Sequence, residues 1–244
     1  MRKIFLINIL ALTFATLSLW AQAPDPVIET LIDRIDLDRM HADIDTLVAF
    51  GTRRATLQGG LDAQDFVYAR LEALGFADLT LHDFDANHDN VVAVYPGVTE
   101  PDEIYIIGAH YDSINDLGPA FPAPGADDNG TGTSGLLEVA RIISESEIRF
   151  EATITLVAFA SEELGRIGSK AFVADAIANG KIPQSAIVMD VLGYHDPGST
   201  LDISFGTTDA ANPIPGTMEL VDVIVSVIEG YLPGYPWEYG DTCT

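Results

Sequence analysis

The stretch "ATITLVAFASEELG", Ala152 to Gly165, decides how this chain folds. Its first half alternates and then becomes continuously apolar, which is typical of a strand buried on both faces of a sheet. Two adjacent acids, Glu162 and Glu163, follow the strand directly. Charge beside a buried strand is costly unless it is paired or bound to metal. The stretch therefore predicts a buried strand with functional acids at its end.

Further strands and helices alternate on both sides of this stretch. Apolar residues at helical spacing predict helices over Pro24 to Phe50, Leu61 to Leu74, Thr131 to Ser146, Gly168 to Ala178 and Met218 to Tyr231. Strands are predicted in "NVVAVYP", "EIYIIGAHYD", "SAIVMDVLGY" and "LDISFG". The alternation indicates an α/β fold, with a mostly parallel central sheet and helices on both faces. Residues 24–244 are expected to form a single catalytic domain.

Residues 1–23 have the features of an export signal. Arg2 and Lys3 precede an apolar run, which ends in the small-residue segment Ala21 to Ala23. A membrane anchor is the alternative, but the run is short for a span and ends in a cleavage-site pattern. We expect a protein that is periplasmic or extracellular and has no membrane partner after cleavage.

The chain is strongly acidic, with 12 Lys and Arg against 37 Asp and Glu and a net charge of −25. Such a surface repels nucleic acid and anionic membranes, so neither is an expected partner. The acids could serve solubility or bind cations, and only their positions can decide between these roles. We expect a monomer, although composition does not define an oligomeric state.

Polar, chemically active side chains follow three of the predicted strands and precede the helix that begins at Thr131. They are His110, Asp112, Asp127, Asp128, Glu162, Glu163 and Asp190. Because ligand sites of open α/β sheets lie at the carboxyl ends of the strands, we expect these groups to converge. One imidazole with several carboxylates suits Zn²⁺, and also Mn²⁺ or Co²⁺. Alone, Ser-Glu-Glu is a solvated turn and Asp-Asp-Asn-Gly a capping turn; together they predict a metal site.

Four of these segments, "GAHYDS", "PGADDNGTG", "FASEELGRIGS" and "MDVLGY", occur in an order and spacing that resembles the M28 family of zinc aminopeptidases. The similarity is to the secreted bacterial leucyl-aminopeptidase type and extends from Leu47 to the last residue. It implies a phosphorylase/hydrolase-like zinc-peptidase architecture. It also implies two Zn²⁺ ions and a hydrolase that removes N-terminal residues from peptides with a free N-terminus.

The resemblance also implies a set of metal ligands. His110 and Asp190 would bind one ion, Asp127 would bridge both, and Glu163 would bind the other. The peptide bond between Asp127 and Asp128 would be cis.

Two further residues are implied to act in catalysis. Glu162 would be the general base that takes the proton of a water shared by the ions, and Asp112 would orient the far nitrogen of His110. A turn-capping role is the alternative for Asp112. We expect Arg53 and Arg54 to form structural ion pairs. The other histidines are expected to be exposed and inert: His41, His82, His88 and His195.

The chain departs from the family pattern near its end. The family's second metal takes a histidine from an "SDH"-like segment, which this sequence lacks; it stops at "WEYGDTCT". By resemblance, Cys243 would be half of a disulfide whose partner lies beyond. We expect a truncated sequence that lacks the last strand and helix, with a short homologue as the alternative. A carboxypeptidase-like or glutaminyl cyclase-like metallohydrolase and an inactive binding module also stay open as functions.

Overall fold

The computed structural model describes residues 24–85, 88–118, 121–194, 198, 200–204, 207–209, 212–213 and 217–240. The predicted export signal, His195 and Cys243 lie outside this range, so the expectations about them stay predictions. Within the described residues, no helix has both the length and the apolar character needed to cross a membrane.

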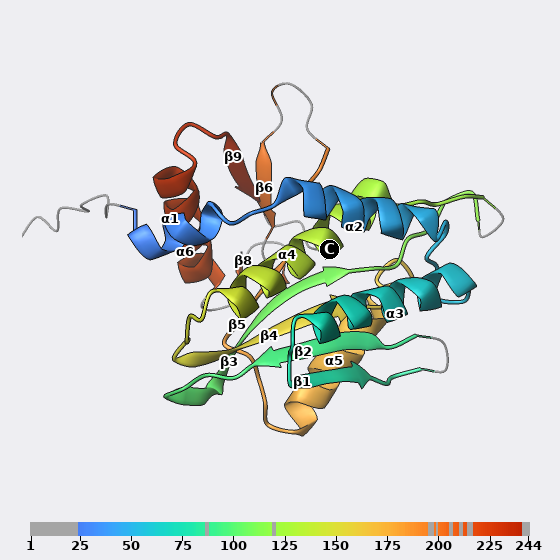
Figure 1. Ribbon diagram of the computed structural model, residues 1–244, viewed down its shortest axis with the longest axis horizontal. Helices are drawn as coiled ribbons and strands as arrows, with labels where there is room; N and C mark the ends of the chain where they lie inside the picture. Colours follow the sequence, from blue (N-terminus) through green and yellow to red (C-terminus); the bar gives the residue numbers. More distant parts are fainter. Residues whose placement is uncertain are drawn as a thin grey trace, which may run out of the picture.

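A five-stranded sheet forms the centre of the molecule (Figure 1). Its strands are β1 (Asp78–His82), β2 (Asn90–Tyr95), β3 (Glu100–His110), β4 (Ala152–Phe159) and β5 (Ser185–Val188), in the order β1-β2-β4-β3-β5. β3 runs parallel to β4 and β5, whereas β2 is antiparallel to both β1 and β4. Every strand except β2 therefore points the same way, which confirms the mostly parallel sheet.

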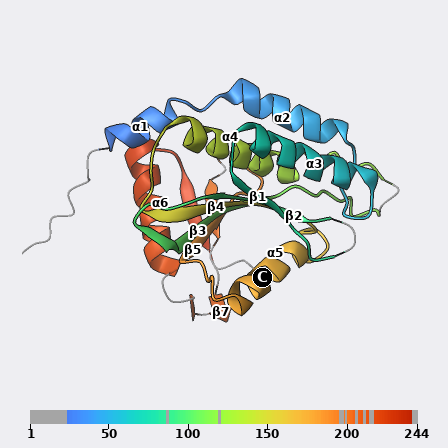
Figure 2. The same ribbon diagram turned by 60° about the horizontal axis from the view of Figure 1, so that its bottom comes forward.

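Helices cover both faces of this sheet (Figure 2). α2 (Leu37–Ala49), α3 (Gln58–Ala73) and α4 (Gly132–Glu145) lie on one face, and α5 (Ile167–Ala178) lies on the other. The predicted helices over residues 61–74, 131–146 and 168–178 are thus confirmed, with small shifts at their ends.

The first predicted helix is interrupted. Residues 24–50 form α1 (Pro26–Ile32) and α2, with a break between them. Asp36 causes the new start, because its carboxylate accepts the N–H of Arg39 at 3.1 Å as an N-cap. The backbone N–H of Asp36 donates to the buried Glu138 carboxylate at 2.7 Å. Apolar spacing alone does not reveal this cap, since it continues through the break.

The main core lies between the sheet and the helices on its α2, α3 and α4 side. Fully or almost fully buried members are Leu47, Val67, Leu71, Val91, Leu136, Leu137 and Leu156. Each buried aliphatic side chain of this size stabilises the fold by roughly 1.5–3 kcal/mol. The core thus anchors the carboxyl ends of β3 and β4, where the polar segments begin.

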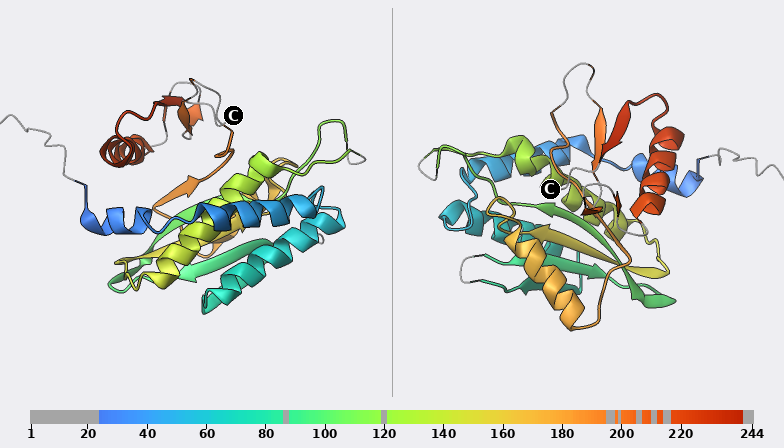
Figure 3. Two further views of the ribbon diagram at one scale, coloured as in Figure 1. Left: turned by 45° about the horizontal axis from the view of Figure 1, so that its top comes forward. Right: turned by 180° about the vertical axis from the view of Figure 1, so that it is seen from behind.

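The C-terminal segments form a separate small unit (Figure 3). β6 (Leu201–Ser204) pairs in parallel with β9 (Trp237–Gly240), and α6 (Thr217–Tyr231) packs on them through Ile203, Val221 and Ile228. β7 (Thr207–Asp209) and β8 (Asn212–Pro213) pair with each other. The strand predicted in "LDISFG" is confirmed over Leu201–Ser204, but it does not pair with β5, which is an edge of the main sheet.

Candidate metal centre

The chemically active segments meet at one edge of the main sheet. β3 ends at His110, β4 ends two residues before Ser161, and β5 ends two residues before Asp190. Because these three strands are parallel neighbours, their carboxyl ends lie side by side. A short helical turn, η1 (Ala126–Thr131), leads from the long loop after β3 into α4 and supplies further acids. The expected convergence is therefore present.

Three side chains form a compact donor cluster at this edge. The His110 Nε2 atom lies 3.3 Å from an oxygen of Asp128 and 3.3 Å from an oxygen of Asp190. All three donor atoms lie within 4.8 Å of one another. The imidazole is buried, whereas about half of each carboxylate side chain is exposed, so the cluster opens to solvent on one side. One imidazole nitrogen with two carboxylate oxygens is a donor set that fits zinc.

Asp127 does not face this cluster, which corrects the predicted ligand set. Its carboxylate accepts the backbone N–H groups of Gly193 at 2.8 Å and Tyr194 at 3.1 Å. The cis peptide bond is likewise one residue further on, between Asp128 and Asn129 rather than between Asp127 and Asp128. Adjacent residues direct their side chains differently, and two consecutive aspartates give no sequence signal of which one faces inward.

The residues around Asp128 tie its segment to the one that carries Asp190. Asn129 donates its side-chain N–H to the carbonyl of Met189 at 2.9 Å. The Thr131 hydroxyl accepts the N–H of Leu192 at 2.9 Å. With the Asp127 contacts, these bonds hold the chain on both sides of Asp190. Sequence reasoning missed these roles because polar residues in a turn usually serve the turn itself.

Asp112 lies behind the cluster and is 1% exposed. Its carboxylate is 3.5 Å from the His110 Nδ1 atom, an ion-pair distance, and it accepts the backbone N–H groups of Glu162 at 3.0 Å and Glu163 at 3.2 Å. It therefore lies beside the far nitrogen of His110, as predicted, and also caps the turn that carries both glutamates. The position of Asp112 therefore fits both roles weighed for it.

The acids around His110 strongly favour a positive charge at this place. Burial of the imidazole opposes protonation, but the carboxylates of Asp112, Asp128 and Asp190 outweigh it and raise the pKa of His110 to about 12. The hydrogen bond with His110 in turn lowers the pKa of Asp128. A metal ion would satisfy the same demand for positive charge.

The two glutamates respond to burial. Partial burial, with Asp128 nearby, raises the pKa of Glu163 to about 7. Burial also raises the pKa of Glu162, against the attraction of the His110 cation. Neither belongs to the cluster of His110, Asp128 and Asp190, which is the one group of three or more such donors found among the described residues. The described residues thus bring together one such set of candidate ligands.

Arg53 and two histidines differ from the expectations. Arg53 is fully buried and donates to backbone carbonyls, and no carboxylate in the described part of the chain pairs with it at ion-pair distance. His88 is 3% exposed rather than exposed. His82 is also mostly buried, with its Nε2 atom 3.0 Å from Asp175. Neither histidine joins the donor cluster. The sequence carries no burial signal for Arg53 and His88, since both lie in polar segments.

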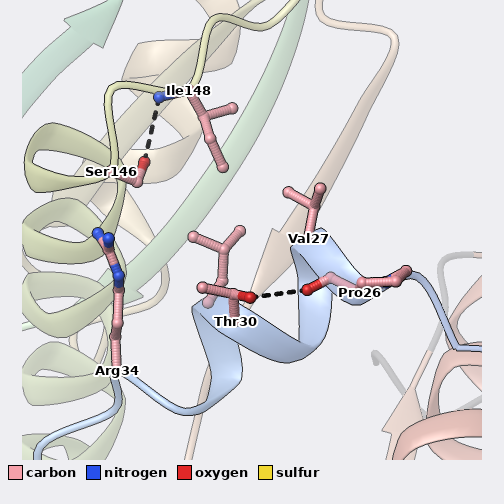
Figure 4. A pocket seen from close by; sticks show the side chains of 7 residues that line it. Pro26, Val27, Thr30, Arg34, Ser146 and Ile148 are labelled. Atoms are coloured by element: carbon pink, nitrogen blue, oxygen red, sulfur yellow. Dashed lines mark hydrogen bonds between the residues drawn. The ribbon is translucent and has the colours of Figure 1, made fainter.

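A separate hollow of about 340 Å³ lies between α1 and the loop after α4 (Figure 4). The apolar walls come from Pro26, Val27, Leu31 and Ile148, and one charged side chain, Arg34, is among the described residues that line it. Among the residues that the structure describes, no acid, histidine or cysteine borders the hollow. It therefore offers none of the chemistry found at the edge of the sheet.

The fold and the donor cluster define an α/β protein with a metal site at the carboxyl ends of its parallel strands. The chain belongs to peptidase family M28, because residues 90–218 match the sequence model of that family. Both the resemblance drawn from the four motifs and the α/β architecture are thus confirmed.

Relatives and solved structures agree with this family. Leucine aminopeptidase 1 of Pyrenophora tritici-repentis is 31% identical over 219 residues, which cover 81% of this chain and 53% of that protein. LapB from Legionella pneumophila has the same fold, with a TM-score of 0.73, 24% identity and coverage of 89% of this chain and 58% of that one. A glutaminyl cyclase from Tannerella forsythia also has this fold, with a TM-score of 0.66 and 20% identity. The match covers 86% of this chain and 78% of that one. The chain spans about half the length of the curated relatives it matches.

Proposed function

We propose that this chain carries the metal centre of a zinc aminopeptidase that removes N-terminal residues from peptides. The observation that supports this most directly is the cluster of His110, Asp128 and Asp190 at the carboxyl edge of the sheet. Membership in peptidase family M28 and similarity to a leucine aminopeptidase support the reaction class. The substrate class is a peptide with a free N-terminus.

In this proposal, His110, Asp128 and Asp190 hold the first zinc ion, with Asp128 in place of the Asp127 expected from the sequence. Bound zinc polarises a peptide carbonyl and makes water a better nucleophile at neutral pH. Asp112 keeps the imidazole oriented, because its carboxylate lies beside the nitrogen that faces away from the cluster.

Glu162 is the proposed general base and acid. It accepts a proton from the attacking water, whose oxygen bonds to the carbonyl carbon, and delivers the proton to the amine as the C–N bond breaks. Its backbone N–H is fixed by Asp112, which holds the start of the side chain near the cluster. The burial that raises the pKa of Glu162 also makes the carboxylate more basic.

A second zinc ion is part of the proposal. Glu163 follows Glu162 and interacts electrostatically with Asp128, so these two carboxylates are the candidates to hold it. Residues 1–23 are proposed to direct export, and the enzyme is proposed to act as a monomer outside the cytoplasm.

Zinc binding and peptide hydrolysis test the function. The chain should bind zinc, measured by calorimetric titration after chelation of resident metal. The longer protein should cleave leucyl-p-nitroanilide but not its N-acetylated form. Glu162→Gln should keep zinc affinity and lose hydrolysis by about 100-fold or more, whereas the exposed control Glu151→Gln should change neither. No zinc binding, equal cleavage of the blocked substrate, or cyclisation of N-terminal glutamine instead of hydrolysis would contradict the proposal.

A further inference from the structure

Arg53 is a fully buried cation, and within the described part of the chain its side chain donates only to backbone carbonyls. Its Nε atom donates to the carbonyl of Tyr111 at 2.7 Å. The two terminal nitrogens donate to Pro124 at 2.5 Å and to Gly125 at 2.9 Å. A contact to Leu47 at 3.3 Å completes the set. A guanidinium can satisfy this many acceptors in fixed directions, whereas an ammonium cannot.

Three of these acceptors, Tyr111, Pro124 and Gly125, belong to the two segments that carry the candidate ligands, whereas Leu47 lies in α2. Tyr111 directly follows His110, and Gly125 precedes Asp128 by three residues. Along the chain, the two segments are separated by the loop between residues 113 and 125. Ser113 adds to the connection that Arg53 makes between these segments. Its hydroxyl accepts the backbone N–H of Arg53 at 3.1 Å and donates to the carbonyl of Ala123 at 2.7 Å.

The backbone at Gly125 shows how closely the parts fit. Gly125 has a left-handed conformation with φ of 52°, and a Cβ there would lie 2.8 Å from an Arg53 nitrogen and 2.5 Å from the carbonyl oxygen of Asp128. The Gly125 carbonyl also accepts the N–H of Gly130 at 3.0 Å, which closes the turn around Asp128. One carbonyl thus connects the guanidinium to the turn that bears the carboxylate.

The charge of Arg53 is also suited to this place. Burial lowers the pKa of the guanidinium to about 10, although Asp112, Asp128 and Glu163 oppose that shift, so it stays charged at neutral pH. It is a fixed cation that faces the acids of the site without pairing with any of them at ion-pair distance.

We propose that Arg53 is a positioning residue of the metal centre, which sets the separation of His110 and Asp128 by binding the backbone of both ligand segments. The inference rests on the proposed zinc site, and Arg53 itself would touch neither metal nor substrate. Its loss should weaken metal binding although every ligand is retained.

Arg53→Lys tests this role, because lysine keeps the charge but not the planar set of donors. We expect the affinity for Zn²⁺ and Co²⁺ to fall by about 10- to 100-fold, as for other residues that orient ligands. The visible absorption of the bound Co²⁺ should change in shape at saturation, since the ligand geometry is altered. In the metal-free protein, hydrogen exchange at the Gly130 amide should become faster than in wild type.

Arg141→Lys is the matched control. Arg141 is another buried arginine, but it pairs with Glu138 and Glu145 on α4, away from the cluster. This variant should lose stability and keep the wild-type Co²⁺ spectrum and metal affinity. If Arg53→Lys behaves in the same way, Arg53 is merely structural and the inference is overturned.

The outcomes also separate this inference from the proposed function. If wild type binds neither metal, the zinc proposal fails and the inference fails with it. If wild type binds metal and Arg53→Lys binds it equally well with an unchanged spectrum, only the inference fails. Should Arg53→Lys not fold, Ser113→Ala tests the same connection between the two ligand segments without burying an unpaired charge. A several-fold loss of Co²⁺ affinity supports the inference, and unchanged affinity overturns it.

Discussion

At the scale of single residues, Asp127 and Asp128 show how neighbours of the same type divide two tasks. Asp128 faces His110, whereas Asp127 accepts two backbone N–H groups from the segment after Asp190. A carboxylate that accepts backbone N–H groups orders the chain around it, and one that faces an imidazole and a second acid attracts a cation. The two aspartates therefore contribute to one site by different physical means.

Substitution of each aspartate by asparagine should separate these tasks. Asp128→Asn replaces a charged metal ligand by a neutral one and should reduce zinc affinity by about 100-fold or more. Asp127→Asn should reduce zinc affinity by about 10-fold, because it loosens the segment that carries Asp190. Calorimetric zinc titration measures both affinities. Hydrogen exchange at the Gly193 amide should become faster in Asp127→Asn alone. A larger loss of affinity in Asp127→Asn than in Asp128→Asn would reverse the assignment.

At the scale of elements, the site depends on polar contacts that connect strand ends to helix starts. Asn90, the first residue of β2, is fully buried. Its side-chain oxygen accepts the backbone N–H of Ala160, just after β4, at 2.9 Å. Its side-chain NH₂ group donates to the backbone carbonyl of Gly168 in α5, also at 2.9 Å. One side chain thus fixes where β4 ends and α5 begins, and with them the turn that carries the two glutamates.

Asn90→Ala should therefore be costly. It leaves the buried N–H of Ala160 unpaired and removes the bonds to the Gly168 carbonyl and the His82 Nδ1 atom, and an unpaired buried group costs about 1–3 kcal/mol. We expect the free energy of unfolding to fall by about 3 kcal/mol, measured by urea denaturation. Asn115→Ala is the matched control, because that side chain bonds to the carbonyl of Pro122 on the surface and should cost less than about 1 kcal/mol. Equal, small losses in both variants would show that the Asn90 contacts are not structural.

At the scale of the whole molecule, the acidic composition and the buried site act together. The chain carries a net charge of −25, and acids concentrate where β3, β4 and β5 end. Without metal, two groups of the folded site bind protons more tightly than usual. Burial and Asp128 raise the pKa of Glu163 to about 7. The surrounding carboxylates raise the pKa of His110 to about 12, although burial opposes this. The stability of the metal-free protein should consequently depend on pH through these two groups.

The sign of this dependence follows from proton binding. The folded pKa of Glu163 lies above its ordinary value of 4.5, so the folded state binds more protons and loses stability as pH rises from about 4.5 to about 7. The His110 contribution is complete below its ordinary value of 6.5 and is lost only above it, up to about pH 12. Between about pH 5 and pH 6.5, therefore, Glu163 is the group of this pair that titrates.

Glu163→Gln should reduce the fall in the free energy of unfolding of the chelator-treated protein between about pH 5 and pH 6.5. Urea denaturation at the two pH values measures this. Glu151→Gln, an exposed residue at the opposite end of β4, should keep the wild-type slope. A steeper fall in Glu163→Gln than in wild type would mean that the sign is wrong.

Much of the fold and part of the site could be predicted from the sequence. Buried strands were evident in their apolar runs, and the acids after them indicated the edge where a site forms, because strand ends and polar residues are local features. The break between α1 and α2 could not be predicted, because it depends on the N-cap Asp36, whose backbone is held by Glu138 from a distant helix. The burial of Arg53 and His88 was missed for the same reason: their surroundings come from other segments.

By itself, the sequence determined that this is an α/β member of peptidase family M28 with an imidazole and carboxylates at the ends of its strands. Only the tertiary structure decided which aspartate faces His110, what Asp127 and Arg53 hold, and how Asp112 fixes both glutamates. The physical reason is that residue type and periodicity are written along the chain. Side-chain direction and the identity of hydrogen-bond partners arise only when distant segments pack together.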